Sequence, residues 1–426
     1  MVASTDIKFY VHTNTNAPQL TNNFGCMIDV LDACLVNGFG SQTVSTLTAS
    51  GTTVTATFGS AHNFMQYQVI KIAGATQTEY NGEFRILTIP DSSSLTFELA
   101  TAPSVTTATG TITASLPPLG WENPFSSSNP NGGGKAAYRS LNLLLPSRPF
   151  LRVVDELDPA YTATYAKYAK VGIVEDMTDI DTMLGVQAPY DSANIDKNWV
   201  GTGSGTSVIN GWAKWYYATA NPVANSSDTS VPSTENRDYI VVGTRDFFYI
   251  LPSSNNLAGF NFSYGFGSFQ SLLNVDTANI FLSASFYHAA ASTAQYRGTY
   301  GGLNTNQASS NRVLLFKPYN MASNYTIAKP FSLAFSSATA AMSSGSSDLI
   351  ATPTLTNTIP LFPVFLIEDT SLVIRSKLNH IFWLVQKIPY THKQIFTHNS
   401  ECFIAVNALH TNAAGSGQIV LKIGGI

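Results

Sequence analysis

The chain has 426 residues, of which 44% are hydrophobic, 12% aromatic and only 11% charged, with a formal net charge of −4. The few basic residues argue against a general nucleic-acid-binding protein, because neutralising phosphates requires a dense basic face. The charged fraction is far below the roughly 25% typical of soluble domains, so the surface must consist mainly of Ser, Thr, Asn, Gln and Gly. Such a surface is typical of an extracellular or particle-bound β-protein that meets many copies of itself, and the length allows two or three domains.

The first forty residues predict a short strand and one amphipathic helix. Ile7–His12 alternates as a strand does. Within Thr21–Gly40, apolar side chains recur at helical spacing and form a stripe that faces the core: Met27, Val30, Leu31, Cys34 and Leu35. We expect Asn22 or Asn23 to cap the helix and Gly38 to end it.

The three cysteines, Cys26, Cys34 and Cys402, lack zinc-site spacing. Cys26 and Cys34 lie about two turns apart on the predicted helix, roughly 12 Å along its axis, which is beyond disulfide reach. We therefore expect free, mostly buried thiols in a protein made in a reducing cytoplasm. The N-terminus has no apolar segment typical of a signal peptide, and no run reaches the roughly 18 apolar residues of a membrane span, so we expect neither.

The segment 41–115 is richer in Thr, Ser and Val than the residues before it, and its pattern predicts a small inserted module. Short strand patterns alternate with turn signals at Thr43–Ala49, Thr52–Phe58, Gln68–Ala73, Gly82–Pro90, Ser94–Leu99 and Gly110–Ala114. This density of strands is typical of a small antiparallel sandwich or barrel. Glycine and proline mark both ends, at Gly40 and Leu116–Pro118, as insertion into a surface loop requires.

We therefore divide the chain into a main β-rich body, residues 1–40 and 116–426, and an inserted β-module, residues 41–115. We expect Gly40 and Leu116 to lie close together in space. A Gly- and Ser-rich stretch leaves open a division of the body into two subdomains, with a break near residues 190–235.

The body again consists mainly of strand patterns. Trp121–Gly134 predicts a loop, whereas Leu141–Leu145 predicts a strand; Asp158–Ala169 fits either a helix or a strand pair, and Ala328–Leu349 either a sheet edge or a surface excursion. Tyr239–Pro252 predicts a hairpin that turns in its middle. Further strands are predicted at Pro149–Val154, Trp212–Ala218, Phe260–Phe269, Ile280–His288, Arg312–Lys317, Ile359–Ile367, Leu372–Arg375, His380–Gln386, Glu401–Val406 and Gln418–Ile423. The predicted fold is mainly β: an antiparallel sandwich- or barrel-type body with one N-terminal helix and an inserted small all-β module.

One aromatic cluster is the strongest candidate binding surface. It consists of Trp212, Trp215, Tyr216 and Tyr217. Aromatic rings stack on sugars, so a glycan-binding surface is one interpretation. Packing in the core or at a subunit interface is the favoured one, because aromatic residues are abundant in both.

No pattern predicts a catalytic, cofactor-binding or metal-binding residue. Asp176, Asp179 and Asp181 could supply oxygen ligands to calcium, but their spacing is not that of a calcium loop, so a solvated turn is favoured. Tyr264–Phe269 and Asn131–Lys135 contain glycines without the remaining features of phosphate-binding loops. The histidines are scattered, and no G-x-S-x-G elbow occurs. We therefore expect a protein that is not an enzyme and binds no cofactor.

Several stretches, taken in order, carry a resemblance to a known family. They are Asp29–Gly40 (DVLDACLVNGFG), Gly120–Phe125 (GWENPF), Lys135–Arg139 (KAAYR), Leu151–Val154 followed by Val171–Thr182, Arg237–Tyr249, Tyr264–Ser271 and Ile374–Leu378 (IRSKL). Together they resemble a family of virion structural proteins of tailed bacteriophages. In relatives the first two stretches run on nearly directly, which supports the inserted segment, and a glycine is expected where this chain has Ser376. The inserted segment itself resembles small β-modules of phage tail proteins.

The resemblance implies a non-enzymatic building block on the tail, neck or baseplate of a phage particle. We expect a symmetric homo-oligomer that also contacts other virion proteins, with the inserted module projecting outwards or gripping a neighbour. The alternatives are a fibre or spike that binds a receptor or host glycan through exposed aromatics such as Trp212 and Trp215, a head-decoration protein, and, third, a polysaccharide depolymerase with two converging carboxylates.

Overall fold

The computed structural model describes residues 2–204, 210–220, 229–253, 255, 261–286, 302–303, 313–330, 334–336, 339–340, 361–384, 390–410 and 413–426. The protein is mainly β, with 53% of residues in strands and 4% in helices, and its sheets are antiparallel, so the predicted fold class of a β-sandwich body with one helix is confirmed. None of the described helices is long and apolar enough to cross a membrane.

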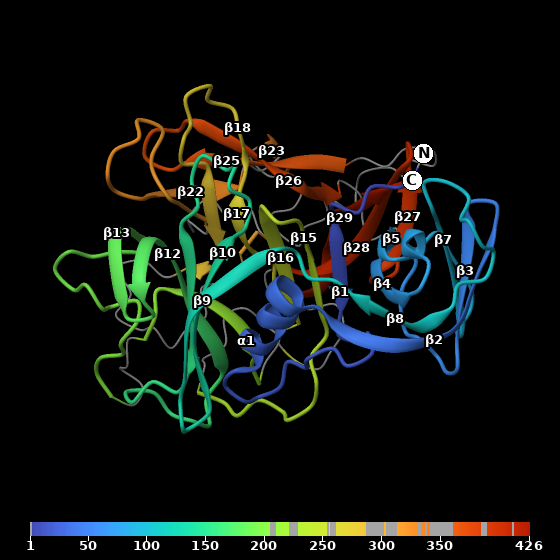
Figure 1. The fold of residues 1–426 in the computed structure, drawn as a ribbon. Coiled ribbons are helices and arrows are strands. Elements are labelled where there is room, and N and C mark those ends of the chain that lie inside the picture. Colours follow the sequence, from blue (N-terminus) through green and yellow to red (C-terminus); the bar gives the residue numbers. More distant parts are fainter. Residues whose placement is uncertain are drawn as a thin grey trace.

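The largest sheet of the described residues has thirteen strands and curls around a core of its own. Its order is β1 (Lys8–Val11), β15 (Tyr239–Gly243), β16 (Phe247–Pro252), β17 (Tyr264–Ser268), β19 (Ile280–Ser283), β21 (Val313–Leu315), β22 (Thr326–Pro330), β25 (Leu361–Glu368), β26 (Ile374–Leu384), β29 (Ala413–Gly425), β28 (Glu401–His410) and β27 (Gln394–His398), with β18 (Gln270–Ser271) paired to β26. The curl brings β1 and β15 against β29 (Figure 1).

The central strands of this sheet are buried on both faces. In β15, Ile240 and Val242 face the core inside the curl, whereas Tyr239 and Val241 face a second core shared with the helix and the other sheets. This two-sided burial explains the continuous apolar run of the predicted hairpin Tyr239–Pro252, which is confirmed as β15 and β16.

A seven-stranded sheet packs on that second core. Its order is β20 (Ser285–Phe286), β14 (Ala213–Ala218), β12 (Lys167–Asp179), β11 (Phe150–Glu156), β10 (Gly133–Ser140) and β9 (Trp121–Ser128), with β13 (Thr182–Ala188) paired to β12. The loop predicted at Trp121–Gly134 is wrong, because β9 and β10 form a hairpin there. Since β9 is an edge strand, Pro124 is tolerated in it.

Two other expectations for this region are wrong. Leu141–Leu145 is a loop with exposed side chains rather than a strand. Asp158–Ala169 is neither a helix nor a strand pair: residues 157–166 form turns, and only the residues from Lys167 on are extended, as the start of β12. The tyrosine spacing there reflects packing of rings instead: Tyr161 contacts Tyr165 and Tyr168 edge-on, with centroids 5.5 and 5.4 Å apart.

A second seven-stranded sheet consists of strands from residues 39–116 and lies at one side of the molecule (Figure 1). Its order is β5 (Gly82–Arg85), β4 (Val69–Ala75), β8 (Gly110–Leu116), β2 (Phe39–Ser50), β3 (Thr53–Phe58), β7 (Ser94–Glu98) and β6 (Thr88–Asp91). Phe39 pairs with Leu116, so the two ends of the segment meet in the same ladder. That the segment folds as an independent unit stays a prediction.

The N-terminal helix is shorter than predicted but buries the predicted stripe. α1 (Cys26–Leu31) continues into a π-helical turn, η1 (Asp32–Asn37), and the apolar residues of the stripe are all fully buried. The helix ends at Gly38, which has φ +71°, and a Cβ there would lie 2.6 Å from the carbonyl oxygen of Leu116. Neither Asn22 nor Asn23 caps it, because it begins after Gly25, without a local side-chain cap.

The cysteines are free and buried, as expected.

The C-terminal strands differ from prediction in two places. Leu372–Arg375 and His380–Gln386 belong largely to one strand, β26, which bulges near His380, where φ is +60°. Strand β27 was not predicted. Of Ala328–Leu349, the described part holds the end of β22 and the short pair β23 (Ala334–Ser336) and β24 (Thr339–Ala340), while residues 341–349 lie outside the described residues.

Candidate functional site

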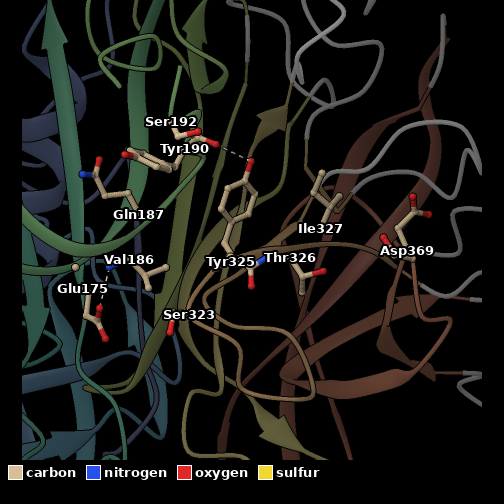
Figure 2. Close-up of a pocket in the computed structure, with 13 residues that line it drawn as sticks. Glu175, Val186, Gln187, Tyr190, Ser192, Ser323, Tyr325, Thr326, Ile327 and Asp369 are labelled. Atoms are coloured by element: carbon tan, nitrogen blue, oxygen red, sulfur yellow. Dashed lines mark hydrogen bonds between the residues drawn. The ribbon is translucent and has the colours of Figure 1, made fainter. Parts of the chain in front are cut away.

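A cleft of about 780 Å³ lies between the β12–β13 hairpin and the strands β22 and β25. One wall comes from the seven-stranded sheet that contains β12 and the other from the thirteen-stranded sheet, so segments far apart in sequence meet there (Figure 2). The residues that line it are Glu175, Gly185, Val186, Gln187, Tyr190, Ser192, Ser323, Asn324, Tyr325, Thr326, Ile327, Asp369 and Thr370. A concave site of this size is where a small ligand is expected to bind.

Two carboxylates stand on opposite sides of the cleft (Figure 2), and each is paired with a lysine. Glu175 Oε1 lies 3.4 Å from Lys317 Nζ, and Glu175 Oε2 accepts a hydrogen bond of 2.8 Å from the Val186 amide. Asp369 lies 3.0 Å from Lys329 Nζ. The carboxylates therefore bring little uncompensated charge to the cleft.

Gly185 allows Glu175 to lie across the hairpin. Its φ is +70°, and a Cβ at this position would lie 2.2 Å from Glu175 Oε2. Only glycine combines this backbone conformation with that approach. The register shift in the middle of β13 is therefore shaped so that the Glu175 side chain reaches the Val186 amide.

Two tyrosines supply aromatic surface to the cleft. The Tyr190 side chain is 38% exposed, and the Tyr325 hydroxyl donates to the Tyr190 carbonyl at 3.5 Å. Figure 2 shows the Tyr325 ring between Val186 and Ile327, with the Tyr190 ring beside Gln187. Partial burial raises the pKa of Tyr325, and the nearby Asp191 carboxylate raises it further, so its hydroxyl is a neutral donor at physiological pH.

Gln187 has a buried hydrogen-bond acceptor without a partner. Among the described residues that line the cleft, it alone has one. It is 9% exposed, and its Oε1 has no hydrogen-bond partner within the described part of the chain. A buried amide oxygen without a partner is unfavourable, which favours an ordered water beside it.

The aromatic cluster predicted from the sequence lies elsewhere and is buried. Trp212 is 4% exposed, and Trp215, Tyr216 and Tyr217 at most 1%, so the four rings present no exposed face to a sugar. Trp215 stacks on Tyr264 at 5.9 Å and donates to the Ser283 carbonyl at 2.8 Å. The glycan-binding interpretation of these four residues is therefore wrong as the chain is folded, and packing within its own core accounts for them.

The acidic trio is spread over a strand end and a turn. Asp176 and Asp179 lie in β12, and Asp181 pairs with Arg152 at 2.6 Å and Lys135 at 2.8 Å. Burial opposes ionisation of Asp181, but the two cations hold its pKa below its ordinary value. No cluster of three or more His, Cys, Asp or Glu suited to a metal ion occurs within the described residues.

One charged cluster was not anticipated from the sequence. Asp238 pairs with His392 at 2.8 Å, Lys393 at 2.5 Å and His12 at 3.3 Å. Burial opposes ionisation of Asp238, yet these partners hold its pKa well below its usual range. The cluster ties the N-terminal strand to the C-terminal hairpin, and a structural role accounts for it.

The cleft residues were also missed by sequence reasoning. Tyr190 and Tyr325 are 135 positions apart and sit in ordinary polar loops, so no local motif connects them. Only the order of strands in the two sheets brings them together.

No protein-family model matches the chain, and no curated protein is significantly similar to it.

Proposed function

We propose that the chain is a non-enzymatic structural subunit of a tailed-phage virion. It would form a symmetric oligomer on the tail, neck or baseplate and contact other virion proteins there. Several stretches of the sequence resemble phage structural proteins in the same order along the chain, which suggests this placement. The antiparallel β-rich body is compatible with it. The structural observation that carries the assembly part of the proposal is a rigid loop of exposed leucines.

This leucine loop, Leu141–Leu145, follows β10. Leu141 is 52% exposed, Leu143 77% and Leu144 87%. Soluble monomers rarely display neighbouring large apolar side chains, and such patches mark contact sites between proteins.

Asn142 holds the leucine loop in one conformation. It is 8% exposed, and its Nδ2 donates to Asp246 Oδ1 at 2.8 Å. Its Oδ1 accepts from the Leu144 amide at 3.1 Å, and its own amide donates to Ser140 Oγ at 2.9 Å. Because the loop is already ordered, burying the leucines in an interface would require little further loss of conformational entropy.

A second set of exposed apolar side chains lies over a buried ion-pair network. Leu272, Val275, Leu372 and Ile374 are 47–75% exposed. Beneath them the fully buried Arg375 binds Asp276 and Glu368. Leu272 also donates its amide to the Arg375 carbonyl at 3.0 Å, which anchors this surface to the buried network. Two apolar surfaces on a chain of low charge favour a subunit that packs against several neighbours.

Two measurements test the proposal together. Light scattering of the purified protein gives its oligomeric state, and mass spectrometry of gradient-purified phage particles shows whether the chain belongs to them. We expect an oligomer in solution and a fixed copy number per particle. A protein that is monomeric at micromolar concentration and absent from the particles would contradict the proposal.

A further inference from the structure

We propose that the cleft between the β12–β13 hairpin and β22 binds a neutral saccharide. The leucine loop and the apolar group around Arg375 account for assembly but make no use of this cleft. The inference therefore goes beyond the proposed structural role and does not depend on it.

The charges around the cleft select against an ionic ligand. An anionic ligand would meet the carboxylates of Glu175 and Asp369, and a cationic ligand would have to compete with their lysine partners, 3.4 and 3.0 Å away. A neutral ligand meets neither difficulty. Glu175 still has acceptor capacity beyond Lys317 and the Val186 amide, which hydroxyl groups can use.

The two tyrosines provide flat surfaces for sugar rings. Tyr190 is 38% exposed, and Tyr325 stands in the middle of the cleft (Figure 2). A pyranose ring has an apolar face of C–H groups that packs on an aromatic ring, while its hydroxyl groups need polar partners at the edge. Tyrosine suits both demands because its hydroxyl lies at the rim of the ring.

The rest of the lining supplies the polar partners. Side-chain hydroxyl and amide groups surround the tyrosines: Ser192, Ser323, Asn324, Thr326, Thr370 and Gln187. Gln187 contributes to the lining as well, but its Oε1 is itself buried, so the hydroxyl groups and the Asn324 amide are the polar partners that the cleft offers. By contrast, Val186 and Ile327 are the aliphatic side chains among the lining residues, too few for a purely apolar ligand.

Saturation-transfer NMR on the full-length protein tests the proposal. The probes are three neutral trisaccharides at millimolar concentration: maltotriose, cellotriose and N,N′,N″-triacetylchitotriose. We expect saturation transfer to at least one of them, and binding of that probe at least about tenfold weaker in a Tyr190→Ala/Tyr325→Ala variant, because two aromatic contacts are lost.

Two control variants separate ring stacking from damage to the fold. Tyr325→Phe keeps the ring and loses the hydroxyl with its hydrogen bond to the Tyr190 carbonyl, so it should weaken binding less than the double-alanine variant. Tyr319→Ala removes another exposed tyrosine, which does not line the cleft, and should leave binding unchanged. The absence of transfer from all three probes, or equal binding by the parent and the double-alanine variant, overturns the proposal.

Discussion

At the scale of single residues, one buried carboxylate links three elements. Asp155 in β11 is fully buried and accepts a hydrogen bond of 3.0 Å from the Met27 amide at the start of α1. The Tyr217 hydroxyl, on β14, donates to its other oxygen at 2.7 Å. Asp155 therefore replaces the missing local cap of the helix with one from a distant strand. It also explains why Tyr217, considered from sequence as a ligand contact, is buried.

Asp155 should make the stability depend on pH. Burial raises its pKa to about 6, although the hydrogen bonds from Tyr217 and the Met27 amide act in the opposite direction. A folded pKa above the unfolded value means that the folded state binds more protons between about pH 4 and 6. The carboxyl group therefore stabilises the fold at low pH, and this contribution is lost as the pH rises through about 6.

The test compares the parent protein with Asp155→Asn, which has nearly the same shape but no titration. Because the pKa differs from its ordinary value by about two units, the stability of the parent relative to the variant should fall by about 3 kcal/mol from pH 4 to pH 7. Urea unfolding at several pH values, followed by tryptophan fluorescence, measures this difference. Other groups titrate in both proteins and cancel, so parallel curves would show that Asp155 does not titrate in this range.

At the scale of elements, the segment 41–115 is joined to the body by a shared apolar core and by buried polar side chains. Arg85 is 2% exposed and donates to the carbonyl groups of Ser4, Ile7 and Ile423 at 2.7–2.9 Å. Gln68 exchanges hydrogen bonds with Asn14 and donates to the Phe9 carbonyl at 3.0 Å. These contacts hold the segment against β1 and β29. When the segment is removed, water can satisfy the carbonyl groups that they leave on the body.

We predict that the body folds without the segment. Phe39 and Leu116 are directly paired, so replacing residues 41–115 by Asn-Gly should close a short hairpin between them. The variant should keep a strand-rich circular dichroism spectrum and a cooperative thermal transition, at a lower midpoint because the docking contacts are lost. A matched full-length variant, Arg85→Met, removes only the arginine hydrogen bonds and should lower the midpoint less. A deletion variant without a cooperative transition would show that the body needs the segment.

Elements with regular apolar patterns could be predicted from the sequence, and elements fixed by distant contacts could not. The stripe of α1 and the strands of residues 39–116 have clear periodicity. Strand β9 does not, because an edge strand with three serines and a proline resembles a loop until its partner β10 is known. Leu141–Leu145 has the composition of a strand, but Asn142 turns it outwards through a bond to Asp246. The cleft was beyond prediction for the same reason, since Tyr190 and Tyr325 meet only through the order of strands.

At the scale of the whole molecule, the surface combines low charge with exposed apolar side chains. Only 11% of the residues are charged, so long-range repulsion between copies is weak. In the proposed assembly, the leucine loop and the group around Arg375 would supply directional contacts. A chain with two different apolar surfaces can contact two different neighbours, as a subunit of a larger assembly must.

The leucine loop should therefore decide self-association. Burying a leucine side chain contributes about 1.5–3 kcal/mol, so Leu143→Ser/Leu144→Ser should weaken an interface that buries both by about 3–6 kcal/mol, which is more than a hundredfold in dissociation constant. Both side chains are more than three-quarters exposed within the chain, so the thermal midpoint of the monomer should hardly change. Sedimentation velocity over a concentration series measures the shift towards monomer. Val231→Ser, which removes another exposed apolar side chain, should leave association intact. If the double serine variant associates as strongly as the parent, the interface lies elsewhere, and the exposed group around Arg375 becomes the surface to vary next.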